Sequence, residues 1–207
     1  MSGLNNNILQ KIKELKPFFE KSVLNDIYSW KELEQFLNFR PAVTDRNLTL
    51  CNTKRYEWLA GGWLTEPNSY PADLLNSELK KSVCYIKDCS RVNKKINNIS
   101  KQLEDTLGHP TDTHIYFSLN TDEGDNTGFG KHKDTQHNII TNVDGSFNIK
   151  LFEDDNIIID EDMQPGDIIF IPAGTYHLVT PKTKRLSLSF AMSPLFDYFQ
   201  TREWLTL

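Results

Sequence analysis

The sequence predicts a mainly β protein, a single barrel with a helical support on its N-terminal side. After Pro110, short apolar or alternating segments recur at regular spacing with turn residues between them, as in barrels and sandwiches. Before Pro110, apolar residues recur at helical spacing. The 207 residues, 38% of them hydrophobic, suffice for one domain with a sizeable core. We therefore expect residues 1–109 to form a helical and mixed support, 110–193 the barrel core and 194–207 a C-terminal helix or tail, all within one structural domain.

In the first half of the chain, the pattern favours two helices with a strand between them. Ser29 to Glu32 has the sequence of a capping box, which opens a helix that runs to Leu37. Asn93 to Leu107 carries apolar residues at helical spacing, and Gly108 stands where a C-cap belongs. Between these helices, Ser82 to Lys87 has the composition of a strand.

The second half of the chain has the pattern of strands and turns. Thr113 to Asn120 alternates polar and apolar residues, which predicts a strand with one polar face. Asp144-Gly145 suits a tight primed turn, so the segments on either side of it, Asn138 to Val143 and Phe147 to Phe152, are expected to form a hairpin. Four further short strands are expected at Asn156 to Ile159, Asp167 to Ile171, His177 to Thr180 and Arg185 to Phe190.

Charge and cysteine content exclude several classes of function. The net charge is −5 and there is no long run of lysine and arginine, so the chain lacks the electrostatic pattern of a general nucleic-acid binder. The 3 cysteines form neither an even set nor a CxxC pair, which favours reduced thiols over disulfides or a zinc site. The sequence begins without a secretory signal, and no apolar stretch is long enough to span a membrane. We expect a cytoplasmic protein with no membrane partner.

Three residues predict a metal centre. His132 and Asp134 form an H-x-D pair, whose side chains share one face of a strand because side chains alternate with period two. Further along, turns containing Pro165 and Pro172 flank an apolar strand and place His177 at the start of the next one. Two histidines and one aspartate form the 2-His-1-carboxylate set, which holds Fe(II) and leaves positions open for a cosubstrate and O2. His132, Asp134 and His177 are therefore the predicted metal ligands and catalytic residues.

Several pieces of sequence between residues 110 and 192 occur together in one known family. They are Ile115-Tyr116, Gly128-Phe129, the H-x-D pair, Gly145, the block from Pro165 to His177 and the strand Leu186-x-Leu188. In these pieces the sequence resembles the JmjC-type cupin hydroxylases, 2-oxoglutarate-dependent oxygenases that include ribosomal-protein oxygenases and the asparaginyl hydroxylase acting on hypoxia-inducible factor. The resemblance implies a double-stranded β-helix (cupin or jelly-roll) barrel, with Fe(II), 2-oxoglutarate and O2 as cofactors.

The resemblance also implies contacts to 2-oxoglutarate. Tyr116 matches the family tyrosine that touches the cosubstrate, although a half-buried core tyrosine would give the same pattern. Asn138 lies where the asparaginyl hydroxylase has a cosubstrate-binding asparagine, and it shares a face with His132 if the strand runs unbroken between them. An asparagine at a strand edge, without a ligand, is the alternative interpretation.

One position departs from the family pattern. The family has a lysine two residues after the hairpin glycine, where it pairs with the far carboxylate of 2-oxoglutarate, and this chain has Phe147 there. Lys150 has the wrong parity to replace that lysine. Arg185-x-Ser187 resembles the R-x-S element of other 2-oxoglutarate oxygenases, so we expect Arg185 to bind that carboxylate, with Ser187 on the same face of the strand. A solvated arginine in a hairpin is the alternative.

The function implied by the resemblance is that of an Fe(II)/2-oxoglutarate-dependent hydroxylase, which couples hydroxylation of a substrate C–H bond to oxidative decarboxylation of 2-oxoglutarate. A peptide or protein side chain is the expected substrate. A small molecule or a tRNA base stays open, as does a metal-binding cupin that does not use 2-oxoglutarate: an isomerase, a dioxygenase or a non-catalytic binding module. Aromatic residues in the C-terminal segment, such as Trp204, predict that it packs on the barrel or on a second subunit, which would form a homodimer.

Overall fold

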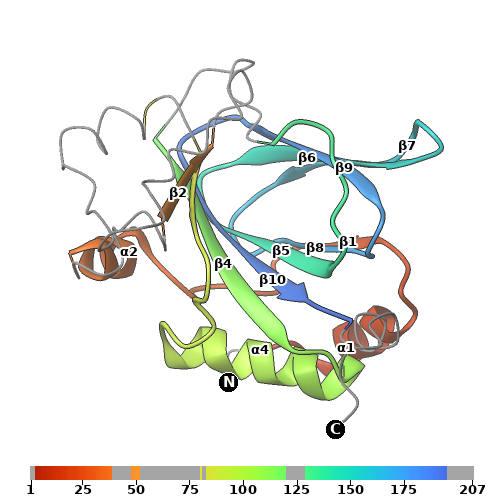
Figure 1. The fold of residues 1–207 in the computed structure, drawn as a ribbon, viewed down its shortest axis with the longest axis horizontal. Coiled ribbons are helices and arrows are strands. Elements are labelled where there is room, and N and C mark those ends of the chain that lie inside the picture. Colours follow the sequence, from red (N-terminus) through yellow and green to blue (C-terminus); the bar gives the residue numbers. More distant parts are fainter. Residues whose placement is uncertain (1–2, 39–47, 52–79, 81–82, 120–128, 195–207) are drawn as a thin grey trace, which may run out of the picture.

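The computed structural model describes residues 3–38, 48–51, 80, 83–119 and 129–194, and for 48–51 the backbone alone. Three helices and ten strands lie in these ranges (Figure 1). In chain order they are α1 (Asn6–Lys13), β1 (Phe18–Glu20), α2 (Trp30–Leu37), β2 (Leu48–Cys51), β3 (Val83–Ile86), α4 (Lys94–Leu107), β4 (Thr111–Ser118), β5 (His137–Asp144), β6 (Phe147–Glu153), β7 (Asn156–Met163), β8 (Ile168–Ile171), β9 (Tyr176–Pro181) and β10 (Arg185–Met192). None of these helices is long and apolar enough to cross a membrane.

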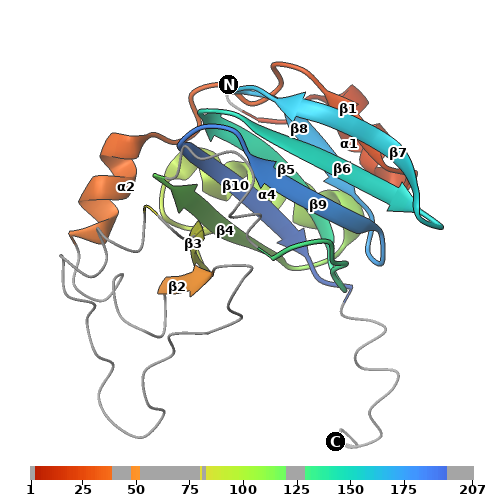
Figure 2. The ribbon, with the colours of Figure 1, turned by 90° about the horizontal axis from the view of Figure 1, so that it is seen from above.

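Two antiparallel sheets face each other and form the barrel (Figures 1 and 2). The large sheet has seven strands in the order β1-β8-β5-β10-β4-β3-β2, and the small sheet has three in the order β7-β6-β9. From β5 onward the chain crosses repeatedly between them, because β5, β8 and β10 belong to the large sheet whereas β6, β7 and β9 belong to the small one. The predicted jelly-roll barrel with helices at its N-terminal side is confirmed.

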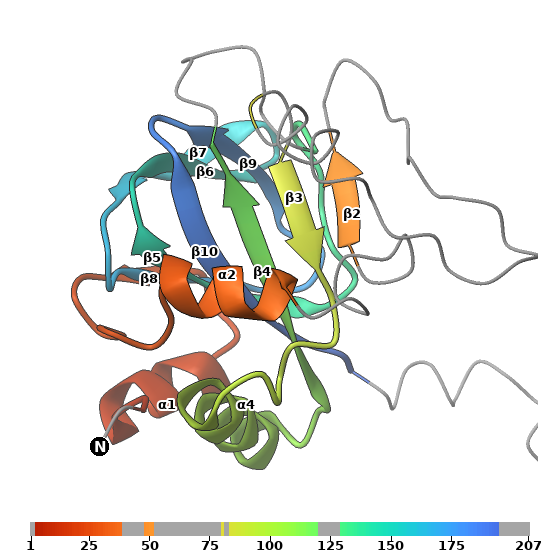
Figure 3. The same ribbon diagram turned by 90° about the vertical axis from the view of Figure 1, so that its left-hand side faces the viewer.

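The large sheet buries a different set of side chains on each face. On β10, Leu186 and Leu188 face outward and join an apolar cluster with the buried side of α4, which lies beside α1 against this sheet (Figure 3). On the inner side, Phe147 and Ile149 of β6 form a second cluster with Ile169 of β8. The helices therefore stabilise the large sheet from outside, and the odd-numbered residues of β10 face the space between the sheets.

The predicted helix ends are also confirmed. The backbone N–H of Glu32 donates to the Ser29 hydroxyl at 3.2 Å, so Ser29 is the N-cap of α2, and that hydroxyl donates to the Glu32 carboxylate at 2.7 Å. Asn93 caps α4 by accepting the backbone N–H of Ile96 at 2.8 Å. Gly108 ends α4 in the left-handed region with a φ of 71°.

The hairpin predicted at Asp144-Gly145 is wrong. β5 and β6 lie in different sheets, so this turn carries the chain from the large sheet to the small one. Both edges of β5 are occupied, by β8 and β10, which leaves β6 no edge of β5 to pair with. The side-chain amide of Asn142 fixes the turn instead, donating to the Gly145 carbonyl at 2.7 Å and to the Met163 carbonyl at 3.1 Å. The turn residues predict the reversal of the chain but not the strand that is paired.

The N-terminal segment contributes strands as well as helices. β1 pairs with β8, and β3 pairs with β4, so both extend the large sheet of the barrel. β1 has only 3 residues, too few for the alternation that would have predicted it. The helix or tail predicted at the C-terminus lies outside the described residues from position 195 onward.

Candidate metal centre

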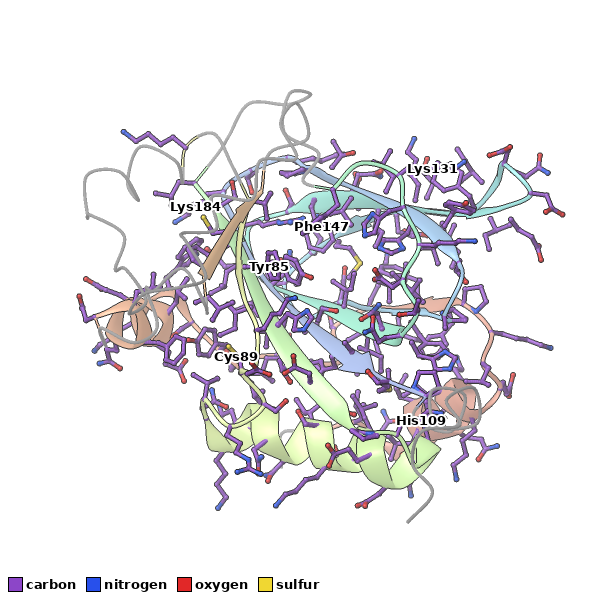
Figure 4. The ribbon with its side chains drawn as sticks, in the orientation of Figure 1. Tyr85, Cys89, His109, Lys131, Phe147 and Lys184 are labelled. Carbon is purple, nitrogen blue, oxygen red and sulfur yellow. The ribbon has the colours of Figure 1, made fainter. Side chains whose placement is uncertain are left out.

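A cavity of about 260 Å³ lies between the two sheets. Its lining includes six residues that the sequence singled out: Tyr116, His132, Asp134, His177, Arg185 and Ser187. Tyr85 and Phe147, which also line it, project into the space between the sheets (Figure 4).

The three predicted metal ligands converge on one point of this cavity. One ligand atom from each lies within 4.8 Å of the other two. Nε2 of His132 lies 3.8 Å from Oδ1 of Asp134, and Nε2 of His177 lies 3.8 Å from Oδ2. The two histidines are also bridged through their backbones: the N–H of His132 donates to the His177 carbonyl at 3.0 Å, and the N–H of His177 donates back at 2.7 Å. This bridge places two residues that are distant in sequence side by side.

The strand predicted for the H-x-D pair is wrong. β5 begins at His137, and His132 takes part only in the isolated bridge to β9. Gly130, with a φ of 68°, bends the backbone just before the pair. The backbone N–H of Gly174 donates to the Asp134 carbonyl at 2.8 Å. Hydrogen bonds between irregular segments, rather than alternation along a strand, therefore hold Asp134 beside the histidines.

Backbone carbonyls fix the orientation of both imidazoles. Nδ1 of His132 lies 2.9 Å from the Gly130 carbonyl, and Nδ1 of His177 lies 3.2 Å from the Thr175 carbonyl. Since a carbonyl only accepts, each Nδ1 carries the proton and each Nε2 presents its lone pair to the centre. Burial lowers the pKa of His177 and the neighbouring His132 lowers it further, while Asp134 raises it. The buried imidazole is thereby favoured in the neutral form, which is the form that binds a metal.

Asn138 lies behind the Asp134 carboxylate. Its side-chain amide donates to Oδ2 of Asp134 at 2.7 Å, and its own Oδ1 accepts the hydroxyl of Ser189 at 3.1 Å. Asn138 is buried, and it is not among the described residues that line the cavity. Its predicted contact with a cosubstrate stays a prediction, and the contact present in the structure is with a metal-ligand carboxylate.

Arg185 provides a buried cation in the cavity wall. Its side chain is buried, and burial lowers the pKa of Arg185 to about 10, against an opposite effect of Tyr116. Its Nε has no hydrogen-bond partner among the described residues. The ring centre of Phe147, which stands at the family's lysine position, lies 5.1 Å from the guanidinium carbon in a cation–π contact. A buried cation without an anionic partner is costly, and a carboxylate ligand would offset that cost.

Tyr116 and Ser187 lie beside each other on the inner face of the large sheet, where they are register partners on β4 and β10. The hydroxyl of Tyr116 lies 3.4 Å from Nδ1 of His114, whose Nε2 lies 2.8 Å from the Asp112 carboxylate. Burial raises the pKa of Asp112, but the hydrogen bond and charge of His114 bring it below its ordinary value. The polar faces predicted for these two strands therefore line the same cavity as Arg185.

Lys150 points away from the cavity, as its parity predicts. Its ammonium group lies 3.2 Å from the Asp160 carboxylate, and both side chains are partly exposed. The small sheet therefore supplies no lysine to the cavity from this position.

Two aromatic lining residues, Tyr85 and Phe129, do not emerge as site residues from sequence reasoning. The ring of Tyr85 stacks on Tyr116 with 5.3 Å between centroids, and Phe129 meets Tyr85 edge-on at 5.6 Å. β3 is buried on both faces, so its residues carry no alternation that marks Tyr85 as inward. Phe129 is placed by contacts with residues distant in sequence. The local sequence offers only the preceding Gly128 as a sign of its role.

The side chains present fit a ferrous ion and 2-oxoglutarate. Two imidazoles held as Nε2 donors and one carboxylate form the donor set of non-haem Fe(II) centres. Arg185 offers a planar cation to a carboxylate within the same cavity. The ferrous ion and 2-oxoglutarate therefore each have matching protein groups in the cavity.

Comparison with known proteins identifies the same fold. The JmjC domain family matches residues 141–197 of the chain. No curated relative matches it in sequence. The ribosomal oxygenase YcfD of Escherichia coli superposes on 96% of this chain with a TM-score of 0.67 and 18% identity. The structure of YcfD in complex with cobalt and 2-oxoglutarate superposes on 99% of this chain, with the same score and identity.

The chain spans 56% and 58% of the length of these two YcfD structures. The superposition includes the N-terminal helices as well as the barrel, since nearly the whole chain is covered. The double-stranded β-helix (cupin or jelly-roll) fold expected from the sequence is therefore confirmed.

Proposed function

We propose that this protein is an Fe(II)/2-oxoglutarate-dependent hydroxylase that acts on a peptide or protein side chain. The observation that carries the proposal is the presence, in one cavity, of a three-residue metal centre and a buried arginine without an anionic partner among the described residues. The fold shared with YcfD, a ribosomal oxygenase solved with cobalt and 2-oxoglutarate, supports it.

When bound, the ferrous ion and 2-oxoglutarate would supply the oxidising chemistry, with O2, that couples substrate hydroxylation to release of succinate and CO2. His132, Asp134 and His177 would hold the ion, and the carbonyl bonds at Nδ1 orient both imidazoles before it binds. Arg185 would bind the far carboxylate of 2-oxoglutarate. Phe147, at 0% exposure beside Arg185, keeps water from the guanidinium and so strengthens that pairing.

The proposed roles of Tyr116 and Ser187 follow from their place next to Arg185. Their hydroxyl groups would add hydrogen bonds to the same carboxylate. Tyr85, Phe129 and Gln136, which also line the cavity, would face the substrate. A protein substrate is proposed because YcfD is a ribosomal oxygenase and has the same fold.

The cofactor assignment is tested by spectroscopy in the absence of O2. Fe(II) followed by 2-oxoglutarate should produce a metal-to-ligand charge-transfer band in the wild-type protein. His132→Ala should abolish the band and the succinate formed when O2 is admitted. A wild-type protein that binds Fe(II) but gives neither band nor succinate would instead favour a cupin that does not use 2-oxoglutarate.

The substrate class is tested by mass spectrometry. Incubation with a ribosomal-protein fraction, Fe(II) and 2-oxoglutarate should add one oxygen atom to a peptide, and His132→Ala should not. Addition of oxygen to a small molecule or to a tRNA base alone would reject the protein substrate. We also propose a cytoplasmic location and a homodimer formed through residues 194–207. The dimer is tested by comparing the mass in solution of the full chain with that of a chain ending at Ser193.

A further inference from the structure

Three polar side chains form a continuous hydrogen-bonded line that ends at the metal centre. The hydroxyl of Ser189 on β10 lies 3.1 Å from Oδ1 of Asn138 on β5, and Nδ2 of Asn138 lies 2.7 Å from Oδ2 of Asp134. Ser189 and Asn138 are both 5% exposed. The line therefore runs from Ser189, a buried residue of the cavity wall on β10, to the irregular segment that carries the H-x-D pair.

Hydrogen-bonding chemistry determines the direction of each bond. An ionised carboxylate only accepts, so Asp134 requires the NH2 side of the Asn138 amide. The remaining amide oxygen must then accept, and the Ser189 hydroxyl is the donor that it meets. The acceptor-only carboxylate thus sets the orientation of the amide, and Ser189 holds Asn138 in that orientation by donating to its oxygen.

Asp134 needs such support more than the two histidines do. Its side chain is 36% exposed, and its segment belongs to no regular strand. The Gly174 bond fixes its backbone carbonyl but leaves the side chain free to rotate. The bond from Asn138 holds Oδ2, so Oδ1, which lies 3.8 Å from Nε2 of His132, keeps its lone pairs for an ion.

We propose that Asn138, oriented by Ser189, is a positioning residue that sets the Asp134 carboxylate for metal binding. The identity of the ion rests on the proposed function. The hydrogen-bonded line from Ser189 through Asn138 to Asp134, called the relay below, would affect the binding of any divalent ion at this centre. Outer partners of metal ligands typically change metal affinity by about 10- to 100-fold. Since Asn138 lies outside the described cavity lining, its removal should leave the affinity for 2-oxoglutarate nearly unchanged.

The test measures Co(II) binding to the protein without 2-oxoglutarate, by titration calorimetry and by the visible absorption of the bound ion. Asn138→Ala should weaken Co(II) binding by about 10- to 100-fold and alter the Co(II) spectrum. Ser189→Ala keeps the amide but loses its orienting donor, so a weakening of a few-fold is expected. Thr141→Val is the matched control, because Thr141 is a buried residue of β5 whose hydroxyl has no hydrogen-bond partner within the described part of the chain. Its Co(II) affinity should equal that of the wild type.

Measurements of thermal unfolding and of 2-oxoglutarate affinity distinguish this positioning role from a purely structural role and from a contact with the cosubstrate. Thermal unfolding of each metal-free variant shows whether the fold is kept, and a purely structural role would lower the unfolding temperature without changing the Co(II) spectrum of the folded protein. A 2-oxoglutarate affinity that falls in Asn138→Ala at saturating Co(II), with the Co(II) affinity unchanged, would overturn the relay in favour of a cosubstrate contact. Equal Co(II) affinities in Asn138→Ala and wild type would overturn the relay alone. A wild type that binds Co(II) but forms no succinate with Fe(II) would reject only the proposed hydroxylase.

Discussion

β10 is buried along its whole length and is hydrogen-bonded to β4 on one side and to β5 on the other. The segment that carries His132 and Asp134, by contrast, meets its neighbours through one backbone bridge and a few separate hydrogen bonds. Arg185 thus projects from a continuous sheet, whereas two of the three candidate metal ligands project from a loop.

This difference shows two ways of positioning a functional side chain. In β10 the sheet itself fixes the direction of Arg185, so the residue can be replaced without loss of the surrounding structure. In the loop, the direction of Asp134 depends on individual bonds from Gly174 and Asn138. Substitutions on the sheet should therefore change ligand affinity more than folding, and substitutions at bends of the chain should do the reverse.

Replacement of Arg185 should give the largest effect and the clearest separation of ligand binding from folding. Arg185→Met removes the proposed partner of a 2-oxoglutarate carboxylate, and loss of one partner of a buried ion pair costs about 3–5 kcal/mol. The dissociation constant for 2-oxoglutarate should then rise by roughly 100-fold or more. The free energy of unfolding of the protein without 2-oxoglutarate should rise by about 1–4 kcal/mol, because the substitution removes a buried charge that has no anionic partner among the residues the structure describes.

Urea unfolding and titration with 2-oxoglutarate at saturating Co(II) measure the two quantities on the same sample. Arg185→Lys keeps the charge but not the planar fork, so its affinity for 2-oxoglutarate should lie between those of wild type and Arg185→Met. An Arg185→Met protein that is less stable and binds 2-oxoglutarate normally would assign Arg185 to the fold and remove it from the proposed site.

The residues that β10 contributes to the cavity could be predicted from neighbouring residues in the sequence. Arg185 and Ser187 alternate with Leu186 and Leu188, so period-two geometry places the two pairs on opposite faces, and the resemblance to the R-x-S element assigned the polar pair to the cavity. The helix start at Ser29 was equally predictable, because the chemistry that stops or starts a helix is contained in a few neighbouring residues.

The loop side and the strand pairing were not predictable in the same way. The turn at Gly145 indicated a reversal, but the partner of β6 depends on which edges other strands have already taken. The bridge between His132 and His177 and the bond from Asn138 to Asp134 join segments that local periodicity does not relate. The H-x-D spacing and the turns before His177 predicted which residues form the metal centre, but not the bonds that hold them together.

The turn that joins the sheets offers a test of folding. A Cβ added at Gly145 would lie 1.8 Å from the Lys184 carbonyl oxygen, at a φ of +75°. Gly145→Ala should therefore lower the free energy of unfolding by about 3 kcal/mol or more, from the strained conformation and the displaced backbone together. Gly108→Ala is the matched control, since its φ is +71° and, apart from its chain neighbours and its own helix, no atom of the described residues lies within 4 Å of the added Cβ. Gly108→Ala should lower the free energy of unfolding by about 1–2 kcal/mol. Equal losses of stability in the two variants, measured by urea unfolding, would show that the contact with Lys184 is unimportant.

The junction between the loop and β5 should be sensitive to pH. Nδ1 of His137 accepts the backbone N–H of Ala173 at 3.0 Å, so protonation there would break this bond. Burial lowers the pKa of His137, and the nearby His109 lowers it further. As pH falls below about 6.5, the unfolded chain takes up the proton first, so the free energy of unfolding should decrease until the folded His137 also titrates.

His137→Gln keeps an acceptor but does not titrate. Urea unfolding of the metal-free proteins between neutral and mildly acidic pH should give a shallower loss of stability in His137→Gln than in wild type. Part of the loss should persist, because the pKa of His177 is lowered by burial as well. Identical pH dependences would show that His137 keeps its ordinary affinity for protons in the folded protein.

The outer surface of the small sheet should give the smallest effect. Lys150 Nζ lies 3.2 Å from Oδ2 of Asp160, but the two side chains are 34% and 45% exposed, so water screens the pair. Lys150→Ala should change the free energy of unfolding by less than about 1 kcal/mol. Its affinity for 2-oxoglutarate should match that of wild type, measured in the titration used for Arg185→Met. A large loss of 2-oxoglutarate affinity in Lys150→Ala would mean that the small sheet, and not β10, provides the cation for the cosubstrate.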